Sequence, residues 1–377
     1  MRRYMETNIQ LLINHLEKEF LVNCKNEAQL LRGKVILDIV LRKQMPKTMN
    51  YNALISAIND SDNTLIETLI ILYIIQTSKR DNNTFTKFND KVFDIVITRV
   101  KDGRLGFENG SGALFNYFTC LLENHLTPVH YVEKILEVLD NVLDEEYNGY
   151  MNIEFHKNIE HINNDFSLES GKTGLLLILL DLFNSNKLDG RIDSIVSRLK
   201  TFVERQIDYL VQHILPVGSV LENYSFFPVE YVDNISTVKN SLGWSNGDLG
   251  HILMLEKASL IFQRNDFDNN FMDRMGSFTL SRKNNLTTEI EHSDFESGSS
   301  GVAMMYRQLH KQTQNDNYLL GYEFWKNETL KLLENDILTD YYENNFDFLG
   351  GSLGVILTLN AFENTEDSLW TDILMIK

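Results

Sequence analysis

The sequence is poor in cysteine, proline and basic residues, and each shortage removes a class of protein. Its only two cysteines, Cys24 and Cys120, exclude a disulfide framework and a cysteine-only zinc site, and we expect both in the core. Four prolines leave long stretches without a helix breaker, which favours a mostly helical protein. A formal net charge of −18 argues against nucleic-acid binding. That charge suits either simple solubility or attraction of a cationic peptide.

The sequence also lacks an apolar run long enough to cross a membrane. The densest run, residues 175–182, is interrupted by Asp181 and followed by Asn184. The first twenty residues mix polar and apolar side chains at helical spacing, which is typical of an amphipathic helix rather than a signal peptide. We therefore expect no integral membrane segment and a cytoplasmic location.

A glycine pattern recurs along the chain. Gly-x-x-Gly is followed at once by an apolar run at residues 171–174, 247–250, 298–301 and 351–354. A weaker copy lies at 109–112, and a further unit without the glycines is expected from about Ser61. The copies are roughly 50 to 75 residues apart, which leaves room for two helices in each unit.

Two kinds of helix are expected within each unit. The runs after the glycines are apolar on nearly all sides, which is typical of helices buried all round. Residues 131–143, 191–213 and 318–333 instead carry one apolar stripe and one charged face, as outer helices do. The pattern predicts an all-α protein, an α/α toroid of roughly six to seven helical hairpins that forms one domain over residues 1–377. The glycines would begin the inner helices around a central cavity, the default binding site.

Two of these glycine segments carry a more specific pattern. Phe227-Pro228 precedes Gly-Trp-Ser-Asn-Gly-Asp-Leu-Gly at 243–250, and Glu-Ser-Gly-Ser-Ser-Gly-Val-Ala occupies 296–303. The first stretch resembles the Phe-Pro and Trp-Cys-Tyr-Gly-Asp-x-Gly of the lanthionine synthetase C-like family, which are peptide thioether cyclases. The second is similar to that family's Cys-His-Gly-x-x-Gly-x-Ala. The resemblance extends from about Asn109 to residue 377 and implies the same toroidal fold.

The resemblance implies a chemistry whose metal ligands are replaced here. In the family, two cysteines and a histidine hold a zinc ion, which makes a substrate cysteine a thiolate that adds to a dehydroamino acid. Ser245 and Glu296 stand at the cysteine positions, and Ser297 stands at the histidine position. A serine hydroxyl is a poor zinc ligand, and Glu296 alone cannot replace three ligands. The resemblance therefore implies a zinc-free protein without a cofactor. It would act on a ribosomally made, dehydrated precursor peptide, with a dehydratase as a candidate partner.

Polar residues beside the glycines form the candidate site, which we expect to be a hydrogen-bonding cup that grips the peptide. The candidate substrate-binding residues are Glu169, Ser170, Trp244, Ser245, Asn246, Glu296 and Ser297. The candidate catalytic residues are Lys172, His251 and Asp248. Lys172 would lower the pKa of a substrate thiol by its charge, and His251 would act as a general base. Glu108 is the nearest counterpart of an acid that the family uses near its second repeat.

Several of these residues allow a second interpretation. Asp248 suits a helix cap, His251 a core position and Trp244 a packed wall. Asp248 and Glu296 also suit a hard cation, or the carboxylate pair of a toroidal hydrolase. The first hypothesis is a cyclase or a peptide-binding partner of the modifying enzymes. The alternative is a non-catalytic scaffold or immunity-type protein that binds a cationic partner. Residues 263–285, rich in Asn and Asp, are expected to form a long surface excursion, either a rim or a flap.

Overall fold

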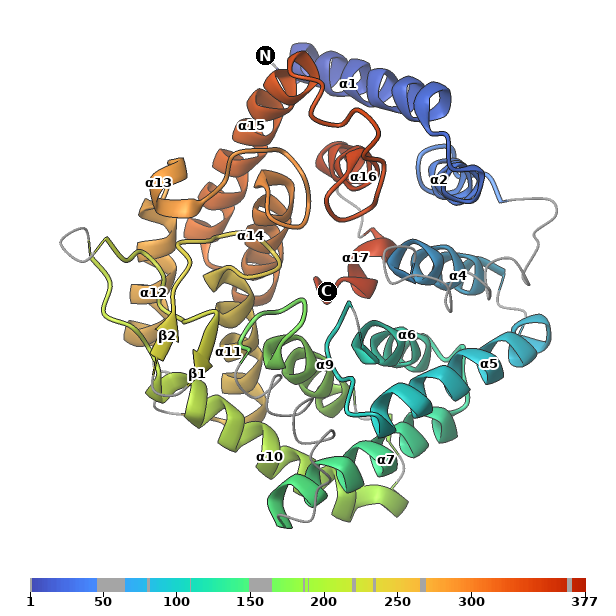
Figure 1. Cartoon of the computed structure of the whole chain (residues 1–377), viewed down its shortest axis with the longest axis vertical. Helices are drawn as coiled ribbons and strands as arrows, with labels where there is room; N and C mark the ends of the chain where they lie inside the picture. The colour runs from blue at the N-terminus through green and yellow to red at the C-terminus, as the bar shows by residue number, and fades with distance from the viewer. Residues whose placement is uncertain are drawn as a thin grey trace.

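The helices form two concentric layers around a common axis (Figure 1). The structure, a computed structural model, describes residues 2–45, 65–79, 82–108, 110–148, 165–185, 187–188, 190–218, 222–232, 235–264, 269–364 and 368–377. The inner helices are α2 (Glu27–Val40), α4 (Leu65–Lys79), α6 (Gly112–Glu123), α9 (Lys172–Asn184), α11 (Asp248–Phe262), α14 (Ser299–Thr313) and α16 (Ser352–Glu363). The outer helices are α1 (Arg2–Asn23), α5 (Asn82–Lys101), α7 (Val129–Asn148), α10 (Asp193–Gln212), α12 (Asn269–Ser281) and α15 (Asp316–Leu338). The predicted α/α toroid is confirmed.

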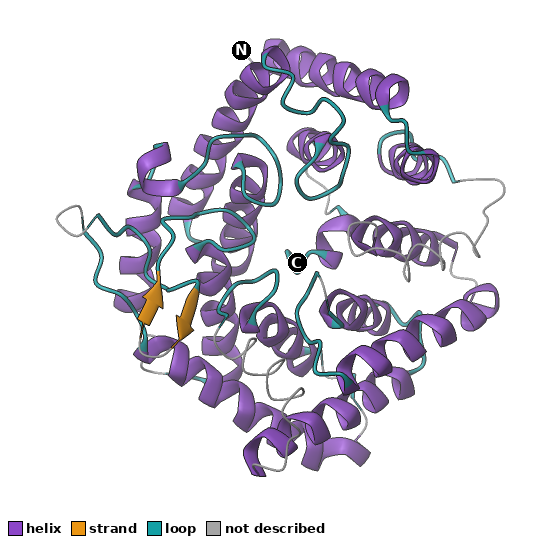
Figure 2. Ribbon diagram, viewed as in Figure 1, coloured by secondary structure: helices purple, strands orange, loops and turns teal. Residues whose placement is uncertain are grey.

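The remaining regular elements are short (Figure 2). They are the 3₁₀ turn η2 (Gly190–Ile192), α13 (Asn285–Thr288), α17 (Leu369–Ile373), and the strands β1 (Glu230–Val232) and β2 (Ile235–Thr237). The strands pair antiparallel, with Glu230 opposite Thr237. In the described part of the chain, every helix is too short or too polar to span a bilayer.

Burial separates the two layers as the sequence patterns predict. All of α9 except Asn184 is buried, which places this apolar helix inside the protein. The outer helix α10 buries one stripe only, formed by Leu199, Phe202, Val203, Ile207 and Leu210. The unit expected from Ser61 contains the inner helix α4, although Ser61 itself lies outside the described residues. Both cysteines are buried and free, as predicted.

The excursion expected at residues 263–285 is mostly helix, so that prediction was wrong. Residues 265–268 lie outside the described part, and α12 follows at Asn269 as an outer helix packed against α11 and α15. Its inner face includes the buried side chains of Met272 and Met275. Phe271, Phe278 and Leu280 pack half-buried beside them, and the surrounding Asn and Asp residues hid this stripe in the sequence.

Inner helices begin where a glycine allows close approach of the preceding loop. Gly298 caps α14, and Gly301 lies one turn further along the helix. A Cβ atom on Gly301 would come within 2.0 Å of the carbonyl oxygen of Phe295, a distance that real Cβ atoms do not reach. The second glycine of the pair therefore lets the loop backbone lie directly on the helix.

Replacing Gly301 with alanine is expected to lower the free energy of unfolding by about 2 to 3 kcal/mol, because the loop carrying Phe295 must move. Gly190→Ala is the matched control, since the nearest atom to its added Cβ would be 3.6 Å away. Urea denaturation of the two variants measures the difference. Equal stability of both would show that the close approach at Gly301 has no structural importance.

The centre of the ring, which the sequence predicted to be a cavity, holds residues of the C-terminal segment (Figure 1). Trp370 on α17 packs edge-on against Phe295 and Phe348, with ring centroids 5.7 Å apart in both cases. The indole of Trp244 donates to the carbonyl oxygen of Leu374 over 3.3 Å. These contacts place apolar side chains on the axis, so the candidate site must lie on the loops above them.

Candidate functional site

The loops that precede the inner helices are joined by a ladder of backbone hydrogen bonds. Glu108 N–H donates to the carbonyl of Glu169 (3.0 Å), and Glu169 N–H donates to the carbonyl of Ser245 (3.3 Å). Ser245 N–H donates to the carbonyl of Glu296 (3.0 Å), and Glu296 N–H donates to that of Leu349 (3.0 Å). Each of these residues lies two positions before the first glycine of its repeat. They therefore occupy equivalent places around the axis.

Three of these equivalent residues, Glu108, Glu169 and Glu296, form what we call the axial carboxyl cluster. The side chains of Glu169 and Glu108 share a hydrogen bond, and the Glu296 carboxylate acts on both through its charge. All three side chains are half-buried. From the sequence, Glu108 was predicted only as the nearest counterpart of a family acid. Counting two residues back from each glycine would have found it directly.

Burial raises the pKa of Glu169 to about 9, helped by its hydrogen bond to Glu108 and by the charges of Glu108 and Glu296. Glu169 is therefore protonated at neutral pH and donates its O–H to the Glu108 carboxylate. Burial also raises the pKa of Glu296, and the charges of Glu108, Asp294 and Asp347 raise it further. Such a carboxyl pair, which shares one proton, can both accept and donate a proton near neutral pH.

Four predicted polar residues lie on the same loops as the cluster. Ser170 and Asn246 are half-buried, whereas Ser297 is exposed and Ser245 is only 2% exposed. The hydroxyl of Ser245 lies 2.8 Å from the Asn246 amide nitrogen, which donates to it. The Ser297 N–H donates to the side chain of Asp294 over 2.9 Å. Ser170, Asn246 and Ser297 therefore remain candidates for contact with a peptide beside Glu169 and Glu296.

Asp248, a predicted catalytic residue, is instead buried in a structural cluster. Its carboxylate pairs with Arg282 over 2.6 Å at 1% exposure of both side chains. It also accepts from the Ser225 hydroxyl (2.8 Å) and from the N–H groups of Phe226 and Phe227. Both carboxylate oxygens are therefore occupied within the protein. The geometry favours a role in holding the Phe-Pro loop, and it does not support a hydrolase or cation site shared with Glu296.

Lys172 and His251, the other predicted catalytic residues, also point into the protein. The Lys172 ammonium lies over the rings of Phe166 and Tyr209, 4.5 Å from each centroid, and the side chain is 3% exposed. His251 Nε2 lies 2.8 Å from the carbonyl oxygen of Phe166, to which it donates. Burial lowers the pKa of His251, which favours its neutral form. These contacts connect a loop to the helices beneath it and favour structural roles for both residues.

Trp244, predicted to bind substrate, is fully buried. Its ring packs between Phe107 and Phe295, with centroid distances of 5.8 and 6.0 Å. Because the indole N–H is also bonded to the C-terminal segment, no part of the side chain faces the loops' outer surface. The structure corrects this prediction: Trp244 is a wall of the axial core.

Comparison with known proteins supports the pattern of loops and glycines. The profile of the family "Lanthionine synthetase C-like protein" matches residues 196–375, the segment that carries the Trp244 and Glu296 loops. This segment, just under half of the chain, belongs to the lanthionine synthetase C-like family. Among solved structures, nisin cyclase has the same fold, with a TM-score of 0.65 at 15% sequence identity over 99% of this chain and 98% of that chain. No curated protein sequence matches the chain.

The residues at the family's zinc positions do not fit a zinc ion. Ser245 offers a neutral hydroxyl that is already bonded to Asn246, and Ser297 offers another neutral hydroxyl on the surface. Glu296 is the only ionisable side chain of the three. Within the described residues, no three His, Cys, Asp or Glu side chains are grouped closely enough to hold a metal. Glu296 instead interacts through its charge with Glu108 and Glu169 on the neighbouring loops.

Glu169 should give the protein a pH-dependent stability. Its pKa is about 9 when folded and 4.5 ordinarily, so between these values the folded chain keeps a proton that the unfolded chain has lost. The stability from this carboxyl is therefore complete below about pH 4.5 and is lost as the pH rises through 9. As the pH rises from about 5 to about 9, the free energy of unfolding of Glu169→Gln should increase by about 1 to 3 kcal/mol relative to that of the parent chain.

Urea denaturation at both pH values measures this change in relative stability. Glu291→Gln, at an exposed position on a neighbouring loop, is the control and should show no such change. If the stability of Glu169→Gln changed with pH in the same way as that of the parent, Glu169 would be ionised in the folded protein.

Proposed function

We propose that this protein is a zinc-free thioether cyclase that acts on a ribosomally made, dehydrated peptide. The axial carboxyl cluster would supply the acid and base that zinc chemistry supplies elsewhere. The family match over residues 196–375 supports the reaction class, and the structural similarity to nisin cyclase is consistent with a peptide substrate. A dehydratase partner and a cytoplasmic location, both expected from the sequence, belong to the same proposal.

One observation carries the proposal: Glu169 is protonated and bonded to Glu108, at the repeat position that Ser245 and Glu296 also occupy. By the family resemblance, the positions of Ser245 and Glu296 are those of the two zinc-binding cysteines. The carboxyl pair therefore lies beside the place where the substrate thiol would be activated. Because its pKa is about 9, Glu169 keeps its proton at neutral pH and can give it up as a general acid.

The pair can complete the addition without a net change in its own protonation. The Glu108 carboxylate takes the proton of the substrate thiol, and the resulting thiolate attacks the β-carbon of the dehydroamino acid. A carbon–sulfur bond forms while the carbon–carbon double bond becomes single. The protonated Glu169 then donates its proton to the α-carbon, and the proton taken by Glu108 restores the shared state of the pair. The Glu296 charge favours keeping one proton on this pair.

The direct test is to incubate the protein with a dehydrated, cysteine-containing precursor in the presence and absence of a zinc chelator. Alkylation followed by mass spectrometry counts the free thiols, because ring closure does not change the mass of the peptide. We expect thiols to disappear at the same rate with and without the chelator, and the purified protein to hold less than one zinc per chain. Activity that the chelator abolishes and zinc restores would contradict the zinc-free mechanism.

Two other outcomes separate the alternatives. Binding of the precursor without ring closure would make the protein a peptide-binding partner of the modifying enzymes. The charge of −18 favours the other alternative, a scaffold or immunity-type protein that binds any cationic partner. In that case binding would not require dehydration of the peptide and would weaken steeply as salt is added. If the protein neither bound the precursor nor closed a ring in it, the proposal would be overturned.

A further inference from the structure

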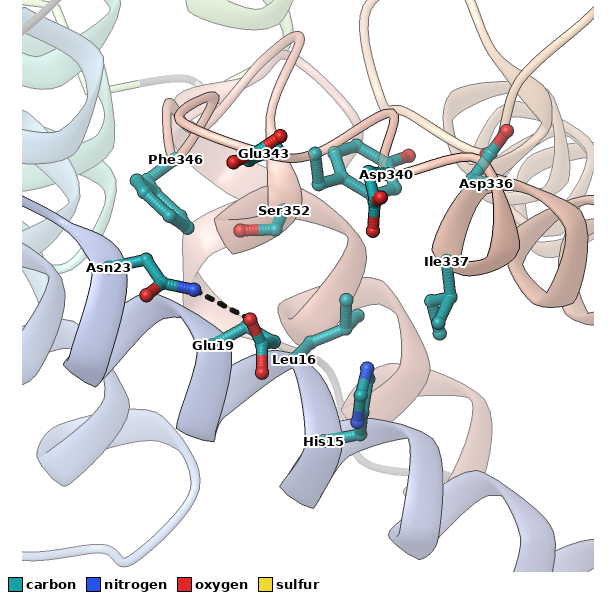
Figure 3. A pocket seen from close by; sticks show the side chains of 11 residues that line it. His15, Leu16, Glu19, Asn23, Asp336, Ile337, Asp340, Glu343, Phe346 and Ser352 are labelled. Atoms are coloured by element: carbon teal, nitrogen blue, oxygen red, sulfur yellow. Dashed lines mark hydrogen bonds between the residues drawn. The ribbon is translucent and has the colours of Figure 1, made fainter.

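A second polar pocket lies away from the axis, between the outer helix α1 and the loop that joins α15 to α16 (Figure 3). Its volume is about 310 Å³. Apolar walls are formed by Leu16, Ile337 and Phe346, and acidic side chains enter from both sides. The pocket is therefore amphipathic: it has apolar walls and several negative groups but no lysine or arginine in its lining.

The acidic groups that face this pocket are not neutralised within the described residues. Glu19 accepts a hydrogen bond from Asn23 over 2.6 Å, but neither Glu19 nor Asp340 nor Glu343 has an ion pair there. Asp336 differs, because its carboxylate already accepts from His292 and Ser293. Three carboxylates on α1 and the loop thus remain available to a cation.

A buried hydroxyl at the same pocket has no partner. Ser352, the first residue of α16, is 1% exposed, lines the pocket and has an Oγ atom without a hydrogen-bond partner in the described structure. Figure 3 shows its hydroxyl between Glu19 below and Glu343 above. A buried hydroxyl is rarely left unpaired, because losing its hydrogen bond to water costs free energy. Because Ser352 also lines the pocket, a polar ligand bound there can bond to its Oγ atom.

Another repeat shows which kind of group fills the equivalent place. Ser352 begins α16 after Gly351, as Asp248 begins α11 after Gly247. The outer helix α12 packs on α11, and α1 packs on α16 in the same way. In the α11 repeat, Arg282, which follows α12, places its guanidinium on Asp248. In the α16 repeat, the pocket that Ser352 lines lies beside Asn23, the last residue of α1, and its lining contains no arginine.

We propose that this pocket binds the guanidinium of an arginine side chain supplied by a peptide partner. The guanidinium would donate to the carboxylates of Glu19 and Glu343 and to Ser352 Oγ, and its methylene groups would lie on Leu16 and Phe346. The inference goes beyond the proposed function, since it requires an arginine on the peptide and does not require ring closure. It gives the acidic protein a second contact with a cationic peptide, separate from the axial carboxyl cluster.

The test uses Nα-acetylarginine amide as the probe and measures its dissociation constant by ligand-observed NMR at low salt. Nα-acetylcitrulline amide has the same shape without the charge and should bind at least about tenfold more weakly. The double variant Glu19→Gln/Glu343→Gln should weaken arginine binding by about tenfold or more. Ser352→Ala should weaken it severalfold, because the guanidinium loses an acceptor.

Ser299→Ala is the matched control for Ser352→Ala. Ser299 begins α14 at the equivalent position, is fully buried and also has an unpartnered hydroxyl, but it does not line this pocket. It should leave arginine binding unchanged. Equal binding of the citrulline probe, or equal weakening by Ser299→Ala and Ser352→Ala, would overturn the inference. Because no ring is formed in this assay, a failure to bind the arginine probe would leave the cyclase proposal standing. Likewise, a failure of ring closure would leave the arginine site standing.

Discussion

Replacing Arg282 with methionine should lower the free energy of unfolding by about 3 to 5 kcal/mol, the largest loss of stability that we expect from one substitution. The guanidinium is 1% exposed and lies 2.6 Å from the Asp248 carboxylate. It also donates to the carbonyl oxygens of Asn240, Ser241 and Thr287 over 2.7 to 2.9 Å. Methionine fills a similar volume but leaves the Asp248 charge buried without its cation.

Urea denaturation monitored by circular dichroism measures this loss, and Lys331→Ala is the control. Lys331 forms an ion pair with Glu328, but its side chain is 73% exposed, so its removal should cost less than about 0.5 kcal/mol. Adding Asp248→Asn to Arg282→Met should recover part of the loss, because the uncompensated charge is gone. A single variant as stable as the control would show that the pair does not hold the Phe-Pro loop.

Replacing Glu169 with glutamine should slow ring closure by about 100- to 10,000-fold, the range usual for the loss of a general acid or base. Glutamine keeps the shape of the side chain and can still donate to Glu108, but it cannot give a proton to the α-carbon. In the parent chain, the rate should fall as the pH rises through about 9, where Glu169 loses its proton. The variant should lose this dependence, which a purely structural role would not produce.

Rates from thiol alkylation across the pH range test both parts of this prediction. Glu291→Gln serves again as the control because this exposed residue lies on the loop before α14, outside the cluster. Peptide binding by Glu169→Gln should remain within a few-fold of the parent. Full activity in this variant would remove the carboxyl pair from the mechanism, whereas a loss of binding alone would make Glu169 a peptide contact.

The layered fold could be predicted from the sequence because its signals are local. The apolar run after Gly174 and the stripe from Leu199 to Leu210 each report burial within one helix. The helix α12 was missed because its packed face, which includes Met272, Met275 and Phe278, lies among many Asn and Asp residues. The filled centre was also missed, since nothing near Trp370 shows that it packs on Phe295, far away in the chain.

The candidate site was only half predictable, and the repeat explains why. Residues two positions before the first glycine, such as Glu169 and Glu296, lie on the axial loops. Residues just after that glycine begin the helix and contact the outer layer, as Lys172 does with Gln206 on α10 and Asp248 with Arg282. Both positions are polar and adjacent in sequence, so residue type alone could not separate them. The partner Arg282, distant in the chain, could not be inferred at all.

The C-terminal segment makes this ring behave differently from an open array of repeats. Asp372 accepts a hydrogen bond from Tyr73 on α4, the carbonyl of Leu374 accepts one from Trp244, and Gln308 on α14 donates to Lys377. Hairpins that lie far apart around the ring are thus all bonded to the same C-terminal segment. In an open array a hairpin can be added or removed with little effect on distant ones. Here the C-terminal segment fits a ring with one number of hairpins. Gaining or losing a hairpin would therefore displace the contacts that the other hairpins make with this segment.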